Sequence, residues 1–200
     1  MNPTIQQLAA DLANGRTTSR KLTEEALARI KDPKGEGERA FIRVWPSQAL
    51  AAAEACDLLR REGLVASPLA GIPVSIKNLC DVKGETTLAG SIVLKQQSIA
   101  TQDAPVVARL RAAGAVVVGS TNMSEFAFSG VGFNPHYGTP GNPADRKRVP
   151  GGSSAGAAVS VADRMAVAAL GTDTGGSVRI PAAVCGIVGF KPTARRVPID

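Results

Sequence analysis

Two serines follow pairs of glycines at points where we expect strands to give way to helices. Gly151-Gly152 precedes Ser153, and Gly175-Gly176 precedes Ser177. Glycine allows the backbone to turn so that consecutive N–H groups point at one spot, and the start of a helix adds a partial positive charge. Each segment therefore predicts a hollow that stabilises an anion, either a phosphate or the oxyanion of acyl transfer.

The phosphate interpretation lacks a fingerprint in this sequence. No glycine-rich run ends in the Gly-Lys-Ser/Thr of a P-loop. Gly130-Val131-Gly132 begins like a dinucleotide-binding loop, but Pro135 stands where the third glycine belongs. The sequence therefore disfavours nucleotide binding and leaves acyl transfer.

A serine nucleophile needs a base, and the usual base is missing. Gly152-Ser153-Ser154-Ala155-Gly156 formally matches the G-x-S-x-G elbow of α/β-hydrolases, with Ser154 as nucleophile. That pattern requires a histidine after the serine, whereas the only histidine, His136, precedes it. The remaining candidate with a suitable setting is Lys77, which ends a predicted strand on its polar face and is followed by Asn78.

The elements before this region are predicted to be mainly helical. Apolar residues recur three or four positions apart, which places them on one face of each helix. Pro46 suits the first turn of a helix, and glycine or Asn-Gly pairs suit helix ends. The expected elements are a helix capped by Thr4 and ended by Asn14-Gly15, a helix from about Ser19 that includes Leu22, Ala26 and Ile30, a strand at 41–45 and a helix at 46–61.

From Pro68 onwards, strands are expected to alternate with helices. In the strand at 72–77, Val74 and Ile76 face one way while Ser75 and Lys77 face the other. A helix at 104–113 leads into an apolar strand at 115–118, and further strands are expected at 165–170 and 187–190. The pattern predicts an α/β fold with a mixed, mostly parallel sheet covered by helices on both faces.

Composition narrows the classes of partner and location. The 200 residues are 44% hydrophobic, and their apolar runs are shorter than the roughly 18 residues of a membrane span. The N-terminus has neither the basic start nor the apolar run of a signal peptide, so we expect a cytoplasmic protein without membrane contact. A net charge of +6 permits a polyanionic partner, but the basic residues are dispersed and only 4% of residues are aromatic, so no direct nucleic-acid binding is expected.

Metal and disulfide chemistry are also not expected. Cys56, Cys80 and Cys185 lie far apart without paired spacing, and only His136 could join them around a metal. We therefore assign the cysteines to packing and predict no metal and no cofactor.

Four ordered motifs closely resemble those of the amidase signature family. They are GIPVSIKN (71–78), GSTNMSEF (119–126), GGSSAG (151–156) and GTDTGGSVRIPAAVCGIVGFKPT (171–193). The spacing of the two serines fits as well, and the resemblance covers roughly residues 5–199. It implies that residues 1–200 are the N-terminal portion of one amidase signature domain, with no separate second domain.

The resemblance implies a Ser–Ser–Lys triad in place of Ser–His–Asp. Ser177 would attack the amide carbonyl, and Ser153, after a cis peptide bond from Gly152, would relay protons to Lys77. The backbone N–H groups of residues 174–177 would form the oxyanion hole. Further positions of the motif would brace the loop or support the triad. The implied oxyanion donors are Thr174, Gly175, Gly176 and Ser177, and the supporting residues are Ser154, Asp173 and Arg179.

The implied activity is hydrolysis of a small-molecule amide through an acyl-serine intermediate, by an enzyme that could form homo-oligomers. Two alternatives share the motifs: the glutaminase subunit of a tRNA-dependent amidotransferase, and an inactive truncated remnant. The chain ends at Asp200, well under half of the usual family length, so we expect little activity from it alone. GGSSAG rather than GGSSGG, and RRVP after KPT, favour the stand-alone amidase.

Overall fold

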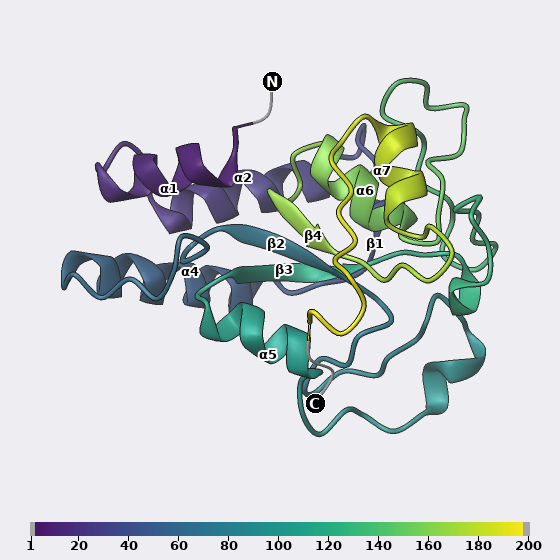
Figure 1. Cartoon of the computed structure of the whole chain (residues 1–200), viewed down its shortest axis with the longest axis horizontal. Helices are drawn as coiled ribbons and strands as arrows, with labels where there is room; N and C mark the ends of the chain where they lie inside the picture. Colours follow the sequence, from purple (N-terminus) through teal and green to yellow (C-terminus); the bar gives the residue numbers. More distant parts are fainter. Residues whose placement is uncertain (1–2, 198–200) are drawn as a thin grey trace.

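The computed structural model describes residues 3–197 and contains a four-stranded sheet in the order β1-β3-β2-β4. β1 pairs with β3 antiparallel, whereas β2 runs parallel to both β3 and β4. α6 and α7 lie on one side of the sheet and α5 on the other (Figure 1). The predicted mixed, mostly parallel sheet with helices on both faces is therefore confirmed. In chain order the elements are α1 (Ile5–Ala13), α2 (Ser19–Lys31), α3 (Gly37–Ala40), β1 (Phe41–Val44), α4 (Pro46–Arg61), β2 (Pro73–Lys77), η1 (Val93–Gln96), α5 (Pro105–Ala112), β3 (Val116–Thr121), η2 (Glu125–Ala127), α6 (Ala155–Ala162), β4 (Ala168–Leu170) and α7 (Arg179–Cys185).

The N-terminal helices follow the expected local signals. Thr4 caps α1: its hydroxyl accepts from Gln7 N, and the Gln7 side chain accepts from Thr4 N. Pro46 opens α4 at its first turn, as predicted. The three N-terminal helix predictions are thus confirmed, while the short helix α3 was not predicted.

Two apolar clusters hold the sheet between its helices. One joins Val116 and Val118 of β3 to α2, α4 and α6. The other joins Val74 and Ile76 of β2 to Val117 and to helices α1 and α5. Because the side chains of a strand alternate between faces, these two clusters leave Ser75 and Lys77 on the same side of β2 as α6.

The first two predicted strands match β1 and β2 to within one residue, whereas the next two differ more from the structure. β3 continues to Thr121 because that residue pairs with β1 on one side and β2 on the other. β4 begins at Ala168, not Met165, because the N–H groups of Met165 and Ala166 donate to the Ser160 carbonyl and cannot enter the sheet.

The predicted strand at 187–190 is wrong. Gly186 ends α7 in a left-handed conformation, and residues 187–190 then run outside the sheet. Val188 is 94% exposed and Phe190 78% exposed. A short apolar run looks the same in sequence whether or not a neighbouring strand is there to pair with it.

The helices within residues 3–197 include none that has both the length and the apolar character of a membrane span.

An apolar groove of about 960 Å3 extends along β4. Leu170, Ile187 and Phe190 contribute apolar side chains to it.

We predict that the chain binds an anilinonaphthalene dye in this groove, because such dyes partition onto accessible apolar surface. Phe190→Ser should lower the dye fluorescence roughly twofold, since an aromatic ring contributes much of a local apolar surface. Leu64→Ser, at an exposed position after α4 outside this groove, is the control. Equal fluorescence of Phe190→Ser and the unmodified chain would contradict the prediction.

Candidate active site

Lys77 is the last residue of β2, and its side chain is completely buried. Its neighbour on the same strand face, Ser75, lies 2.9 Å from Ser160 of α6, hydroxyl to hydroxyl. Burial lowers the pKa of Lys77 to about 8, against the opposing effects of Cys80 and Asp173. Removal from water penalises the charged ammonium form, so at neutral pH about a tenth of this lysine is a free amine.

The Lys77 amine contacts two hydroxyl groups. Its Nζ atom donates to Ser153 Oγ at 2.6 Å and to Thr172 Oγ1 at 2.8 Å. Thr172 was not among the sequence candidates. Strand geometry explains its place: β2 and β4 are parallel, with Ile76 opposite Leu170, so the residues that follow each strand meet at the same edge of the sheet.

Ser153 is held from both sides by neighbouring backbone. The peptide bond between Gly152 and Ser153 is cis. Gly152 N donates to the Gly130 carbonyl at 2.8 Å, and Ser124 N donates to the Ser153 carbonyl at 3.1 Å. A methyl group on Gly152 would lie 2.7 Å from the backbone of Gly132, so only glycine fits there. The Ser153 hydroxyl is thereby fixed in a fully buried position beside the lysine.

Ser177 lies next to this pair through its backbone. Ser154 N donates to the Ser177 carbonyl at 3.1 Å, which joins the two serine-bearing loops. Ser154 Oγ also donates to the Thr172 carbonyl at 3.5 Å. The structure thus gathers Lys77, Ser153, Ser154 and Ser177 at one end of the sheet, where β2 and β4 terminate.

Asp173 organises the loop that carries Ser177. Its carboxylate accepts from the N–H groups of Gly176, Val178 and Arg179. The Arg179 guanidinium adds two contacts, at 2.8 and 2.9 Å. The hydrogen bonds from the Arg179 side chain are the main reason that the pKa of Asp173 is held below its usual range. Asp173 therefore stays ionised and keeps the loop closed around its side chain.

The four residues expected as oxyanion donors lie in this loop but differ in solvent exposure and in hydrogen bonding. The Gly176 N–H donates to Asp173 Oδ1 at 2.9 Å. Gly176 is buried and has a φ of 130°, a conformation that residues with a side chain rarely adopt. Thr174 and Gly175 are exposed, and Ser177 is half-buried. An incoming anion would reach the exposed part of the loop directly.

His136 lies outside this cluster. Its Nε2 atom is 3.0 Å from Glu125 Oε1, and the Ser91 hydroxyl donates to the same oxygen at 2.6 Å. The three cysteines are free thiols, and within residues 3–197 no group of three or more His, Cys, Asp or Glu side chains could hold a metal ion. The chemistry available at the sheet end is therefore that of a buried amine, hydroxyl groups and backbone N–H donors.

Comparisons with known proteins match almost the whole chain. A family model described as Amidase matches residues 21–200. The chain is 44% identical to AtzE, a component of the 1-carboxybiuret hydrolase of Pseudomonas sp. strain ADP, over 96% of this chain and 42% of that protein. It is 47% identical to a glutamyl-tRNA(Gln) amidotransferase subunit of Chromohalobacter salexigens, over 97% of this chain and 39% of that protein.

The comparison with solved structures also matches this chain to amidases. The X-ray structure of the native peptide amidase from Stenotrophomonas maltophilia superposes with a TM-score of 0.87 at 42% identity, covering 95% of this chain and 40% of that one. The chain therefore spans about two fifths of the length of these relatives.

The first site prediction concerns the protonation of Lys77. In a chain labelled with 13C- and 15N-lysine, the Lys77 side-chain resonances should titrate with a midpoint near pH 8, because burial disfavours the ammonium form. Thr172→Val should lower the midpoint further, since the lost hydroxyl accepts a hydrogen bond from the Lys77 amine that favours the charged form. Exposed Lys147 serves as the control for labelling and assignment in both proteins. A Lys77 midpoint at the ordinary lysine value of about 10.4 would contradict the prediction.

Proposed function

The chain belongs to the amidase family, and from that premise we propose that its site hydrolyses the C–N bond of a small-molecule amide through an acyl-serine intermediate. The observation that carries the proposal is the fully buried Lys77 amine, 2.6 Å from the Ser153 hydroxyl. A neutral amine in hydrogen-bond contact with a hydroxyl is the arrangement that general-base activation of an alcohol needs. Residues 1–200 are proposed to form one part of a single amidase domain.

In this mechanism Ser177 is the nucleophile. Its Oγ atom forms a bond to the amide carbonyl carbon, and its proton passes to Ser153 while the Ser153 proton passes to neutral Lys77. The same route in reverse delivers a proton to the leaving nitrogen as the C–N bond breaks, which releases ammonia or an amine. Water then attacks the acyl-serine by the same relay and releases the carboxylate.

The oxyanion of the tetrahedral intermediate is proposed to bind the backbone N–H groups of Thr174, Gly175, Gly176 and Ser177. Preorganised donors of this kind each contribute roughly 100-fold to 1000-fold in rate. Because the Gly176 N–H donates to Asp173 in the free chain, its use would require that bond to lengthen or be shared. Asp173 and Arg179 are proposed to position the loop, and Ser154 to tie it to the triad.

The same site chemistry would serve the glutaminase of a tRNA-dependent amidotransferase. The 47% identity to an amidotransferase subunit supports that alternative. The two differ in the acyl group that they accept and in whether a partner receives the ammonia. Ammonia release from glutamine, measured beside release from aliphatic and aryl amides, separates them. Preference for glutamine would favour the amidotransferase role.

We predict that, in a protein extended to the length of its relatives, Ser177→Ala abolishes amide hydrolysis and covalent labelling by a fluorophosphonate, because both require the nucleophilic hydroxyl. Intact-mass spectrometry and peptide mapping provide the measurement. Ser98→Ala, at an exposed serine outside the site, is the matched control and should label like the unmodified chain. Attachment of the probe to Ser154 would overturn the assignment and restore the G-x-S-x-G interpretation.

A second functional prediction is the pH dependence. The base form of Lys77 increases as pH rises through about 8, so the rate of Ser177 acylation should rise tenfold per pH unit below about 7 and level off above about 9. Lys77→Ala should lower that rate by several orders of magnitude, on the order of 1000-fold or more. Labelling or turnover that falls steadily from pH 6 to pH 9 would exclude a lysine base.

A further inference from the structure

Ser124 has a buried hydroxyl that does not make the bond expected from its place in the chain. It stands directly before η2, where a serine ordinarily caps a helix by accepting a hydrogen bond from an N–H group of the first turn. Among the hydrogen bonds described for residues 3–197, none joins the Ser124 side chain to the N–H groups of η2. The hydroxyl donates instead to the Ser129 carbonyl at 3.0 Å, and Ser124 is only 1% exposed. Its placement therefore serves something other than the helix that it precedes.

Two hydrogen bonds of Ser124 lead to the two ends of the Gly152–Ser153 dipeptide. The backbone N–H of Ser124 donates to the Ser153 carbonyl at 3.1 Å. The hydroxyl holds the Ser129 carbonyl, and the carbonyl of the next residue, Gly130, accepts from Gly152 N at 2.8 Å. We call this pair of bonds the Ser124 clamp, because one residue fixes the dipeptide at its amide end and at its carbonyl end.

The Ser124 hydroxyl also packs directly against Gly152. A methyl group built on Gly152 would lie 2.8 Å from Ser124 Oγ. Close packing of this kind resists a shift of the dipeptide toward Ser124. Any shift of the dipeptide would move the Ser153 hydroxyl, which lies 2.6 Å from Lys77 Nζ.

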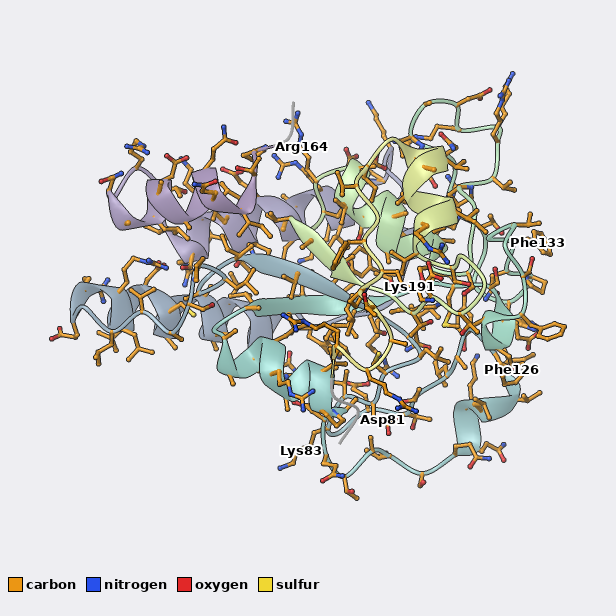
Figure 2. The ribbon with its side chains drawn as sticks, viewed as in Figure 1. Asp81, Lys83, Phe126, Phe133, Arg164 and Lys191 are labelled. Atoms are coloured by element: carbon orange, nitrogen blue, oxygen red, sulfur yellow. The ribbon has the colours of Figure 1, made fainter. Side chains whose placement is uncertain are left out.

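Polar contacts of the next residue give Ser124 a fixed place. Glu125 Oε1 accepts from the Ser91 hydroxyl at 2.6 Å and lies 3.0 Å from His136 Nε2. Figure 2 shows Phe126 at the outer surface of the molecule, and this residue is 51% exposed. Packing of that ring therefore does not hold the segment, and the contacts of Glu125 do.

We propose that Ser124 is a positioning residue that keeps the Ser153 hydroxyl within hydrogen-bond distance of Lys77. This inference rests on the proposed function, in which Ser153 relays protons between Ser177 and Lys77. Ser124 acts through Ser153 and has no direct part in bond making. Because Ser153 Oγ accepts a hydrogen bond from the Lys77 ammonium group, displacement of Ser153 would favour the neutral amine and lower the pKa of Lys77.

Hydrogen exchange in the 200-residue chain tests the clamp without catalysis. In Ser124→Ala the Gly152 amide should exchange about tenfold faster, since the loss of one hydrogen bond is worth roughly that factor. Ser67→Ala is the matched control: its hydroxyl donates to the Ala113 carbonyl at 2.7 Å, and its loss should leave the exchange of Gly152 unchanged. Equal exchange of Gly152 in Ser124→Ala and in the unmodified chain would overturn the clamp.

The unmodified chain provides a test that does not depend on the folding of Ser124→Ala. The clamp protects the amides of Ser124 and Gly152 together, so their protection factors should agree to within about threefold, as for groups released in one opening event. Protection factors that differ by more than about tenfold would mean that the two amides open separately, which would overturn the clamp.

A second pair of measurements distinguishes positioning from a purely structural role. The Lys77 midpoint of Ser124→Ala, followed by lysine side-chain resonances in the 200-residue chain, should lie below that of the unmodified chain. In a protein extended to the length of its relatives, the same variant should slow fluorophosphonate labelling of Ser177 by roughly 10-fold to 100-fold at high pH, because a displacement of about 1 Å in a reacting group costs that much. Ser67→Ala should keep both values. A lower free energy of unfolding with an unchanged Lys77 midpoint would overturn the positioning role.

The outcomes separate this inference from the proposed function. Unchanged Gly152 exchange and an unchanged Lys77 midpoint in Ser124→Ala, with Ser177 still labelled, would overturn the role of Ser124 and leave the amidase proposal intact. Faster Gly152 exchange and a lower Lys77 midpoint, in a protein whose Ser177 does not label, would support the role of Ser124 and count against the amidase proposal.

Discussion

The removal of one amine from water is the constraint on which the rest of the site depends. A lysine at the end of a strand is ordinarily a solvated cation, and its charge would then prevent it from acting as a base. Lys77 is instead enclosed completely, and its pKa is lowered to about 8. Such burial is unfavourable for the charged form, so the protein must surround the amine with packing that outweighs this cost. The two apolar clusters share β3, the strand beside β2, and one of them also includes Val74 and Ile76 of β2, the strand that carries Lys77.

Parallel strands explain how residues far apart in sequence reach that amine. Lys77 and Thr172 are 95 positions apart, yet each follows or ends one of two paired parallel strands. Ser153 enters from a third direction, through a loop packed against the segment after β3. Its close approach is possible because Gly152 meets the backbone of Gly132 without a side chain between them. The sheet thus positions Lys77 and Thr172, and the glycine-rich loop allows Ser153 to approach them.

Much of this arrangement follows from local sequence signals, and the exceptions have identifiable causes. Caps and periodicity located α1, α2 and α4 because those signals act within a few residues. The expected strand at 187–190 failed because pairing depends on a distant partner that a local pattern does not reveal. Thr172 was missed for a similar reason, since the register between β2 and β4 is a tertiary property. The triad positions were assigned through family motifs; residue chemistry alone had reached only Lys77 and the two glycine–serine turns.

Arg179 affects the pKa of Lys77 indirectly, through the charge of Asp173. No hydrogen bond described for residues 3–197 joins Arg179 to Lys77. Asp173 raises the pKa of Lys77, against the lowering by burial. The Arg179 guanidinium contacts both carboxylate oxygens of Asp173 and offsets its negative charge. Without that partner the carboxylate would favour the ammonium form more strongly, and less of the lysine would be a free amine at neutral pH. The ion pair between Asp173 and Arg179 therefore has two effects. It holds the backbone loop before Ser177 in shape, and it weakens the influence of the Asp173 carboxylate on the pKa of Lys77.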